Sequence, residues 1–194
     1  ETNKNYVAAL NELAAKNPRR RIVIAEEDSN IALKRLVATN SWQDKRAVVF
    51  LDPYGMEVEW STLEALAKTE AIDVWFLFPL AGLFRQATRR LTDIDEHKRA
   101  ALTRMFGSAL WEEELYPQNN ESDLFGALPE RRRELNPGGL EAYVQRRLGT
   151  IFGKVLKPLA LPMRKIHKCF PCFFVSQIEL RRPLVLQQIS EVTF

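Results

Sequence analysis

Long apolar runs and cysteines are the features that this sequence most clearly lacks. No stretch of its 194 residues approaches the roughly 20 consecutive apolar residues that a membrane-spanning helix requires. Its two cysteines, Cys169 and Cys172, cannot build a disulfide framework. These absences argue against a membrane protein and against a small secreted scaffold. We therefore expect a cytoplasmic protein without membrane contacts.

Glycine and histidine are also scarce. Only 8 glycines occur, and no two stand as G-x-G, the spacing of a phosphate-binding loop. The chain has two histidines, His97 and His167, and no nucleophile elbow, so hydrolase chemistry has little support. Cys169 and Cys172 form a C-x-x-C, but no second pair accompanies it and His167 is the only further ligand nearby. We expect no metal site.

Charge is distributed unevenly along the chain. The net charge is only +3, but residues 131–182 contain 12 Lys and Arg against 3 Asp and Glu. A basic face of this kind suits a polyanion such as RNA or DNA. The alternative is a solvated surface whose acidic neighbours lie elsewhere in the fold. On the first interpretation, the substrate's phosphates bind Arg131, Arg132, Arg146 and Arg147.

Apolar strands alternate with helices in the first part of the chain. Short β-branched or aromatic runs at 21–25, 47–51 and 73–78 lie about 26 residues apart, with a helical pattern in each gap. This spacing predicts βαβ crossovers and a parallel sheet with helices on both faces. Two further strands are expected near 155–160 and 170–176, followed by a helix that opens at Pro183.

The middle of the chain has the sequence pattern of helices, and this divides the chain into three expected segments. Asp95 is a predicted helix cap, and Gly107 is the predicted end of the same helix. We expect an α/β core over 1–81, a helical insertion over 82–153, and closing strands with a helix over 154–194.

The loop after the second predicted strand is the sharpest chemical feature. Asp52, Pro53 and Tyr54 directly follow the apolar run 47–51. The Asp52 carboxylate and a neighbouring backbone carbonyl can accept hydrogen bonds from a planar amine, while Tyr54 offers a stacking face. Ligands of parallel sheets bind beyond the carboxyl ends of the strands, where this loop belongs. The alternative is an ordinary strand-ending turn, because Asp-Pro is common turn chemistry.

A longer stretch around this loop resembles a known family. Residues 49–80 read VFLDPYGMEVEWSTLEALAKTEAIDVWFLFPL, and the similarity extends to Trp42, to 27–30 and to 105–116. These residues resemble the three-Cys-motif partner family of bacterial proteins over about two-thirds of the chain. The resemblance implies a Rossmann-like methyltransferase fold that uses S-adenosylmethionine, with a mostly parallel sheet and a helical insertion. The runs 21–25, 47–51 and 73–78 would be its third, fourth and fifth strands.

The resemblance also implies roles for individual residues. Asp28 matches an acidic residue that faces the cofactor's adenine, with Asn30 in the same loop, and Glu1 falls where an acidic residue binds the cofactor ribose. Asp52, Pro53 and Tyr54 match the fourth-strand motif, which is similar to the Asp-Pro-aromatic-Gly loop of tRNA guanine N2-methylases. The family's first strands and glycine-rich cofactor loop would precede Glu1, so we expect further native residues upstream.

Two hypotheses from different classes follow. The first is a methyltransferase-like enzyme that acts on an exocyclic amine of a nucleic-acid base, with Asp52, Pro53 and Tyr54 as its catalytic loop. The second is a non-catalytic binding platform, since family members are paired with a three-Cys-motif protein that resembles radical-SAM enzymes. Such a pair would belong to a phage-defence or DNA-processing system. Fold alone does not decide between them.

Overall fold

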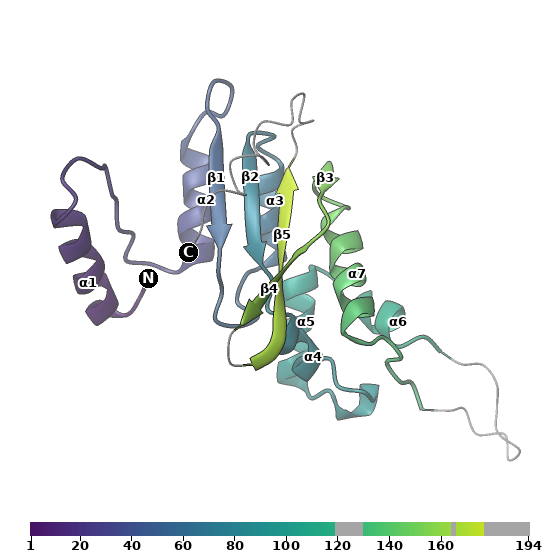
Figure 1. Cartoon of the computed structure of the whole chain (residues 1–194). Helices are drawn as coiled ribbons and strands as arrows, with labels where there is room; N and C mark the ends of the chain where they lie inside the picture. Colours follow the sequence, from purple (N-terminus) through teal and green to yellow (C-terminus); the bar gives the residue numbers. More distant parts are fainter. Residues whose placement is uncertain (119–129, 164–165, 177–194) are drawn as a thin grey trace, which may run out of the picture.

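A mixed sheet forms the centre of the protein in the computed structural model, which describes residues 1–118, 130–163 and 166–176 (Figure 1). The elements follow in the order α1 (Lys4–Ala15), α2 (Ser29–Thr39), β1 (Ala47–Leu51), α3 (Trp60–Ala67), β2 (Ile72–Leu77), α4 (Leu80–Gln86), η1 (Leu91–Asp93), α5 (Glu96–Phe106), α6 (Trp111–Leu115), α7 (Pro137–Leu148), β3 (Lys154–Val155), β4 (Leu159–Met163) and β5 (Ile166–Ser176).

The sheet combines one parallel pair with antiparallel neighbours. β1 runs parallel to β2, with Ala47 opposite Ile72, and β2 is antiparallel to β5. β3 and β4 both pair antiparallel with β5. The protein is therefore a mixed α/β fold, as predicted. A mostly parallel sheet is not confirmed, because β1 and β2 are the only parallel pair among the described strands.

The strand predicted at 21–25 is not formed. This segment has no regular secondary structure, and the side chains of Ile22 and Val23 are 40% and 77% exposed. A β-branched run becomes a strand only when a neighbouring strand accepts its backbone hydrogen bonds. Among the described residues β1 pairs with β2 alone, so its other edge has no partner strand. Residues 21–25 do not pair with this open edge, so their backbone groups have no ladder to join and the strand predicted from local pattern is wrong.

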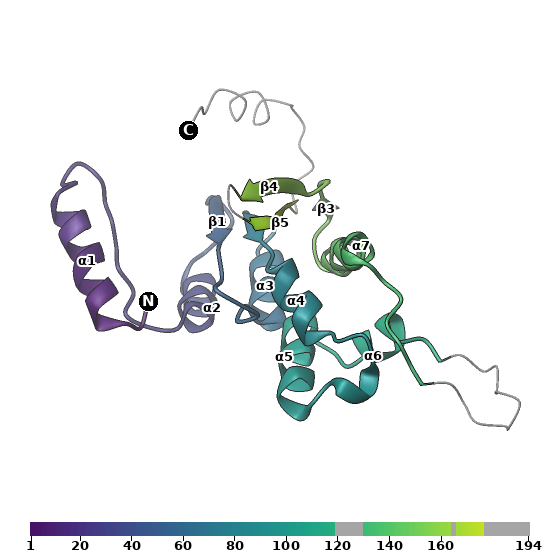
Figure 2. The ribbon, with the colours of Figure 1, turned by 60° about the horizontal axis from the view of Figure 1, so that its bottom comes forward.

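One face of the sheet carries the hydrophobic core. Along β2 the side chains of Ile72, Val74 and Phe76 are fully buried, and the residues between them are half-buried. Helices α2, α3 and α7 lie on the same side of the sheet (Figure 2). On the opposite face of β1, Val48 and Phe50 are 66% and 63% exposed. Within the described residues the helices thus cover one face, whereas the sequence pattern predicts cover on both.

Helix ends in the middle of the chain follow local chemistry. The Asp95 side chain accepts a hydrogen bond from the Lys98 backbone N–H and caps α5. Gly107 ends the same helix in the left-handed conformation, with φ of 74°. Both ends are confirmed as predicted. Asn136 caps α7 in the same way as Asp95, by accepting from the Gly139 N–H.

No helix in the described ranges is long and apolar enough to cross a membrane. The longest, α1 and α7, have 12 residues each, against the roughly 20 that a span requires. The helix predicted from Pro183 lies outside the described residues.

Candidate functional site

The Asp52–Tyr54 loop leaves the sheet at the carboxyl end of β1. Leu51 is buried and anchors the strand, whereas Asp52 is exposed and Tyr54 is 95% exposed. Tyr54 lines an open hollow of about 610 Å³ together with Glu1 and, from α1, Tyr6 and Leu10. The polar end of the loop is therefore accessible to a ligand, and its aromatic ring is free to stack.

Glu1 lies beside the loop that precedes α2. Its backbone nitrogen donates hydrogen bonds to the carbonyls of Ala25 and Glu27, at 3.0 and 3.2 Å. Its Oε1 accepts from the backbone N–H groups of Thr2 and Asn3. Asp28 uses Oδ1 to cap α2, accepting from the N–H groups of Asn30 and Ile31. Each carboxylate has one oxygen in these local bonds.

Asn30 is a structural residue in this fold. It is 6% exposed, and its amide nitrogen donates to the Glu57 carbonyl while Oδ1 accepts from the Glu59 N–H and the Thr62 hydroxyl. Lys34 forms an ion pair with Glu59 beside it, at 2.6 Å, and this hydrogen bond lowers the pKa of Glu59. Asn30 thus joins α2 to the segment after β1 through a side chain that is engaged in the interior.

The four arginines predicted to bind substrate do not share a face. Arg131 donates to the carbonyls of Tyr116 and Glu112, both at 2.7 Å, and so binds backbone carbonyls of α6 and of the residue that follows it. Arg147 lies over the Trp60 ring at 4.9 Å and donates to the Phe106 carbonyl. These two side chains serve the interior.

Arg146 and Arg132 are exposed but lie apart. The Arg146 guanidinium sits 5.2 Å from the Tyr143 ring on the last turn of α7, while Arg132 precedes the first turn. At 1.5 Å per residue, Arg146 lies roughly 14 Å along α7 from Pro137, and Arg132 precedes Pro137 by five residues. The described residues of 131–182 therefore do not form a single basic face.

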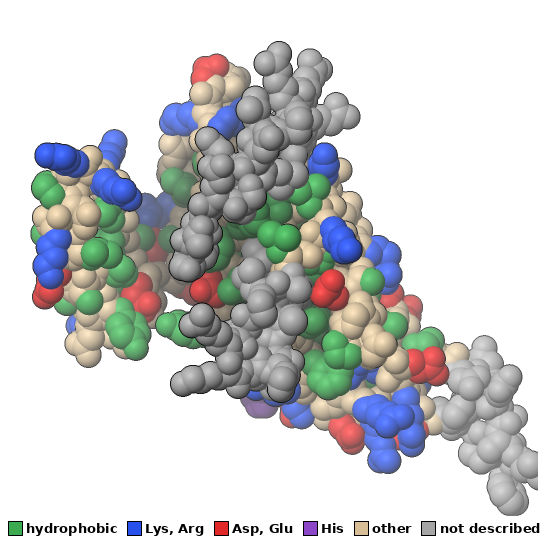
Figure 3. Space-filling view, in the orientation of Figure 1, with side chains coloured by type: hydrophobic (Ala, Val, Ile, Leu, Met, Phe, Trp, Pro, Cys, Tyr) green, Lys and Arg blue, Asp and Glu red, His purple; other side chains and the backbone are tan. Residues whose placement is uncertain are grey.

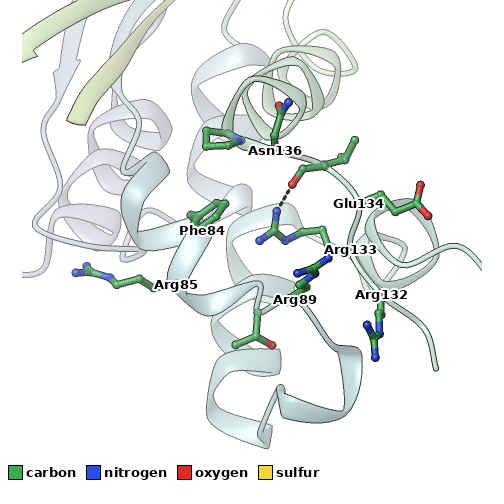
Figure 4. A pocket seen from close by; sticks show the side chains of 10 residues that line it. Phe84, Arg85, Arg89, Arg132, Arg133, Glu134 and Asn136 are labelled. Atoms are coloured by element: carbon green, nitrogen blue, oxygen red, sulfur yellow. Dashed lines mark hydrogen bonds between the residues drawn. The ribbon is translucent and has the colours of Figure 1, made fainter. Parts of the chain in front are cut away.

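A different basic site forms where two distant segments pair. Residues 89–91 and 131–133 run antiparallel, through the bonds from Leu91 N–H to Arg131 and from Arg133 N–H to Arg89. The paired segments form part of the wall of an open pocket of about 820 Å³, which we call the basic pocket (Figure 4). Its lining residues are Phe84, Arg85, Thr88, Arg89, Arg132, Arg133, Glu134, Leu135, Asn136 and Pro137.

Arg133 forms the wall of the basic pocket. It is 7% exposed, donates to the carbonyls of Ala87 and Leu135, and places its guanidinium 4.6 Å from the Phe84 ring centre. Figure 4 shows the bond to Leu135 and the ring of Phe84 beside this side chain. Phe84 thus lies against a buried guanidinium group while remaining 43% exposed.

Glu130 partly balances the charge at the pocket's outer rim. It pairs with Arg90 and Arg132, both at 3.3 Å, and accepts a hydrogen bond from the Thr92 hydroxyl. The Thr92 bond, followed by the two arginines, lowers the pKa of Glu130. Arg85 projects away from Arg132 in Figure 4, so the pocket's cations are spread rather than stacked.

Four lining residues of the basic pocket lie outside the basic stretch 131–182: Phe84, Arg85, Thr88 and Arg89. The sequence signal for two of them is the run Arg85…Arg89-Arg90, which lies far from the basic stretch 131–182. Composition by window cannot join the two, because only the tertiary pairing of 89–91 with 131–133 brings them together.

Comparisons of the chain with protein-family models, with curated proteins and with solved structures find no match. Functional assignment therefore depends on the residues and their geometry. Among the described residues no three His, Cys, Asp or Glu side chains gather as a metal site. His167, Cys169 and Cys172 fall in β5, but their side chains lie outside what the structure describes, so the expectation for them stays a prediction.

Proposed function

We propose that this protein is an S-adenosylmethionine-dependent methyltransferase-like enzyme that acts on an exocyclic amine of a nucleic-acid base. The observation that carries the proposal is the exposed Asp52–Tyr54 loop at the carboxyl end of β1, which shares a hollow with Glu1. This edge of a parallel pair is where ligands of α/β sheets bind.

Each residue of the loop has a defined role in this proposal. The Asp52 carboxylate accepts a hydrogen bond from the amine and orients its lone pair, and Tyr54 stacks on the base. The Pro53 carbonyl accepts the second amine hydrogen. Proton removal is a minor demand, because methyl transfer to an amine depends chiefly on alignment. The loop therefore acts by positioning.

The residues present fit the cofactor only in part. Glu1 and Asp28 flank one loop, and each has a single oxygen engaged in local bonds, so both carboxylates suit ribose hydroxyls or an adenine amine. Asn30 does not fit, because its amide is engaged in the interior. The cofactor supplies an electrophilic methyl group on a sulfonium. We assign Glu1 and Asp28 to its adenosine half and Asn30 to their support.

The strand arrangement also supports the proposal. The resemblance expects the fourth and fifth strands to be neighbours and a closing hairpin to follow. β1 and β2 are parallel neighbours, and the hairpin of β4 and β5 pairs with β2.

The test combines titration with a transfer assay. Isothermal titration of S-adenosylmethionine and S-adenosylhomocysteine into the protein measures cofactor binding. Methyl transfer to RNA and DNA is then compared for the unmodified protein and for Asp52→Ala. We expect Asp52→Ala to abolish transfer with folding intact, and Asp44→Ala, a matched exposed carboxylate before β1, to leave it unchanged. Full activity in Asp52→Ala would overturn the assignment.

A second candidate function is a binding platform for a three-Cys-motif protein. Two observations favour it: one edge of β1 has no partner strand among the described residues, and Val48 and Phe50 are exposed on one face of that strand. Figure 3 shows hydrophobic side chains on the sheet face that is turned to the viewer. Such edges readily accept another chain. A stable complex together with no cofactor binding would favour the platform over the enzyme.

A further inference from the structure

The cations of the basic pocket are incompletely paired. Among the described residues, no carboxylate lies within salt-bridge distance of Arg85 or Arg89, and both side chains are exposed. Arg132 shares Glu130 with Arg90, so one carboxylate serves two guanidinium groups. The pocket therefore keeps positive charge that the described part of the chain does not neutralise.

The lining of the pocket is one-sided in charge. Four arginines face one glutamate, Glu134, and the start of α7 contributes at Asn136 and Pro137. A helix N-terminus adds positive partial charge to that of the arginines. The volume of about 820 Å³ lies within the range of roughly 300–1,000 Å³ typical of ligand sites. An anion with several charged groups fits this lining.

Phe84 narrows the class of anion. One side of its ring lies against Arg133, which is itself held by two backbone carbonyls, and the ring remains 43% exposed. A partly exposed aromatic ring beside arginines is the combination that proteins use for single strands, where bases stack and phosphates pair with cations. An acidic peptide would use the arginines and leave the ring without a partner.

We propose that the basic pocket binds the backbone of a single-stranded nucleic acid, with a base stacked on Phe84 and phosphates on Arg85, Arg89 and Arg132. This inference rests on the proposed function for its substrate class and specifies the form of the polymer. A duplex is disfavoured because its bases are stacked internally and cannot reach a side-chain ring.

The position of the pocket suits this role. α4 begins directly after β2 ends, so Phe84 and Arg85 lie beyond the same edge of the sheet as the Asp52–Tyr54 loop (Figure 1). A strand held in the basic pocket runs along the edge at which the proposed chemistry takes place.

The experiment is fluorescence anisotropy of labelled 12-nucleotide oligo(dT) and oligo(U) with this chain, repeated over a series of salt concentrations. We expect Arg85→Ala/Arg89→Ala to weaken binding about tenfold or more and to lower the slope of log affinity against log salt by about 1.4, because two phosphate contacts are lost. Lys154→Ala/Lys157→Ala is the charge-matched control, since both lysines are exposed and lie away from the pocket. Glu134→Gln should strengthen binding.

The outcomes separate this inference from the proposed function. Retained oligonucleotide binding by Asp52→Ala, together with its loss in the double arginine variant, would support a pocket distinct from the catalytic loop. Equal weakening in the lysine control, unchanged binding in the arginine variant, or equal affinity for a duplex of the same length would overturn the inference. None of these results depends on methyl transfer, which the cofactor titration and the Asp52 variant test separately.

Discussion

Arginine has opposite roles in two neighbouring regions of this molecule. In the interior set, Arg131, Arg133 and Arg147 are buried or half-buried and donate to backbone carbonyls, and the latter two also lie against aromatic rings. At the rim of the basic pocket, Arg85 and Arg89 are exposed and lack a carboxylate partner among the described residues. The first set stabilises the fold and the second is available to a ligand. A count of positive charge cannot distinguish them.

The largest effect is expected from Gly107→Ala, which disrupts the interior set. Gly107 has φ of 74°, and an added Cβ would overlap the Trp60 ring on which Arg147 lies. The left-handed backbone and the overlap together lower the free energy of unfolding by about 3 kcal/mol. Urea denaturation measures the change.

Gly55→Ala is the control for this variant, because no atom lies within 4 Å of the position of its Cβ. Its free energy of unfolding should stay within about 0.5 kcal/mol of the unmodified protein. Equal destabilisation of the two variants would show that overlap with the Trp60 ring is not what destabilises Gly107→Ala.

A smaller effect separates the two kinds of arginine directly. Arg133→Met removes the donor to the Ala87 and Leu135 carbonyls, and we expect a loss of about 2 kcal/mol in stability. Arg89→Met alters an exposed side chain and should change stability by no more than about 0.5 kcal/mol. If thermal unfolding gives the same shift for both, the division into structural and available arginines is wrong.

Local chemistry determined the parts of the fold that the sequence predicted well. The runs at 47–51 and 73–78 became β1 and β2 within one residue, and the Asp95 and Gly107 helix ends are confirmed. In each case the deciding interactions lie within a few residues or in a strongly apolar run. Short-range patterns are sufficient there.

Predictions failed where the local structure depends on a hydrogen-bond partner that is distant in the sequence or competes with the expected one. Ser61 and Glu64 have the S-x-x-E spacing of a capping box, a pattern that predicts a helix start after Ser61, but α3 begins at Trp60. Glu64 instead accepts from the Trp60 indole N–H, and the Ser61 hydroxyl donates to Glu59. The cap's partners are therefore engaged elsewhere.

The candidate site shows the same limit. The sequence located the Asp52–Tyr54 loop because an apolar strand ends directly before it. It missed the basic pocket because that pocket depends on the pairing of residues 89–91 with 131–133. Asn30, which the sequence analysis places in the cofactor loop, is buried, and burial cannot be read from a single letter of the sequence.

The smallest expected effect concerns tyrosine, which shows the same contrast as arginine. Tyr116 is fully buried beside Arg133 and donates to the Thr88 carbonyl, whereas Tyr54 is 95% exposed. Burial raises the pKa of Tyr116 to about 12, although the nearby Arg133 opposes the shift. In the unfolded chain a tyrosine ionises near pH 10.

The sign of the pH dependence follows from this difference. Below about pH 10 both states keep the proton and the contribution of Tyr116 to stability is complete. Between about pH 10 and 12 the unfolded chain loses its proton first, so stability falls as the pH rises toward the folded-state pKa of about 12.

Urea midpoints measured across this window should decline less steeply in Tyr116→Phe than in the unmodified protein. Tyr54→Phe is the matched control and should keep the original slope, because unfolding hardly changes the surroundings of an exposed ring. If the urea midpoint declined equally with pH in all three proteins, the Tyr116 hydroxyl would be exposed to solvent. Arg133, which lies beside it, would then not be a buried arginine.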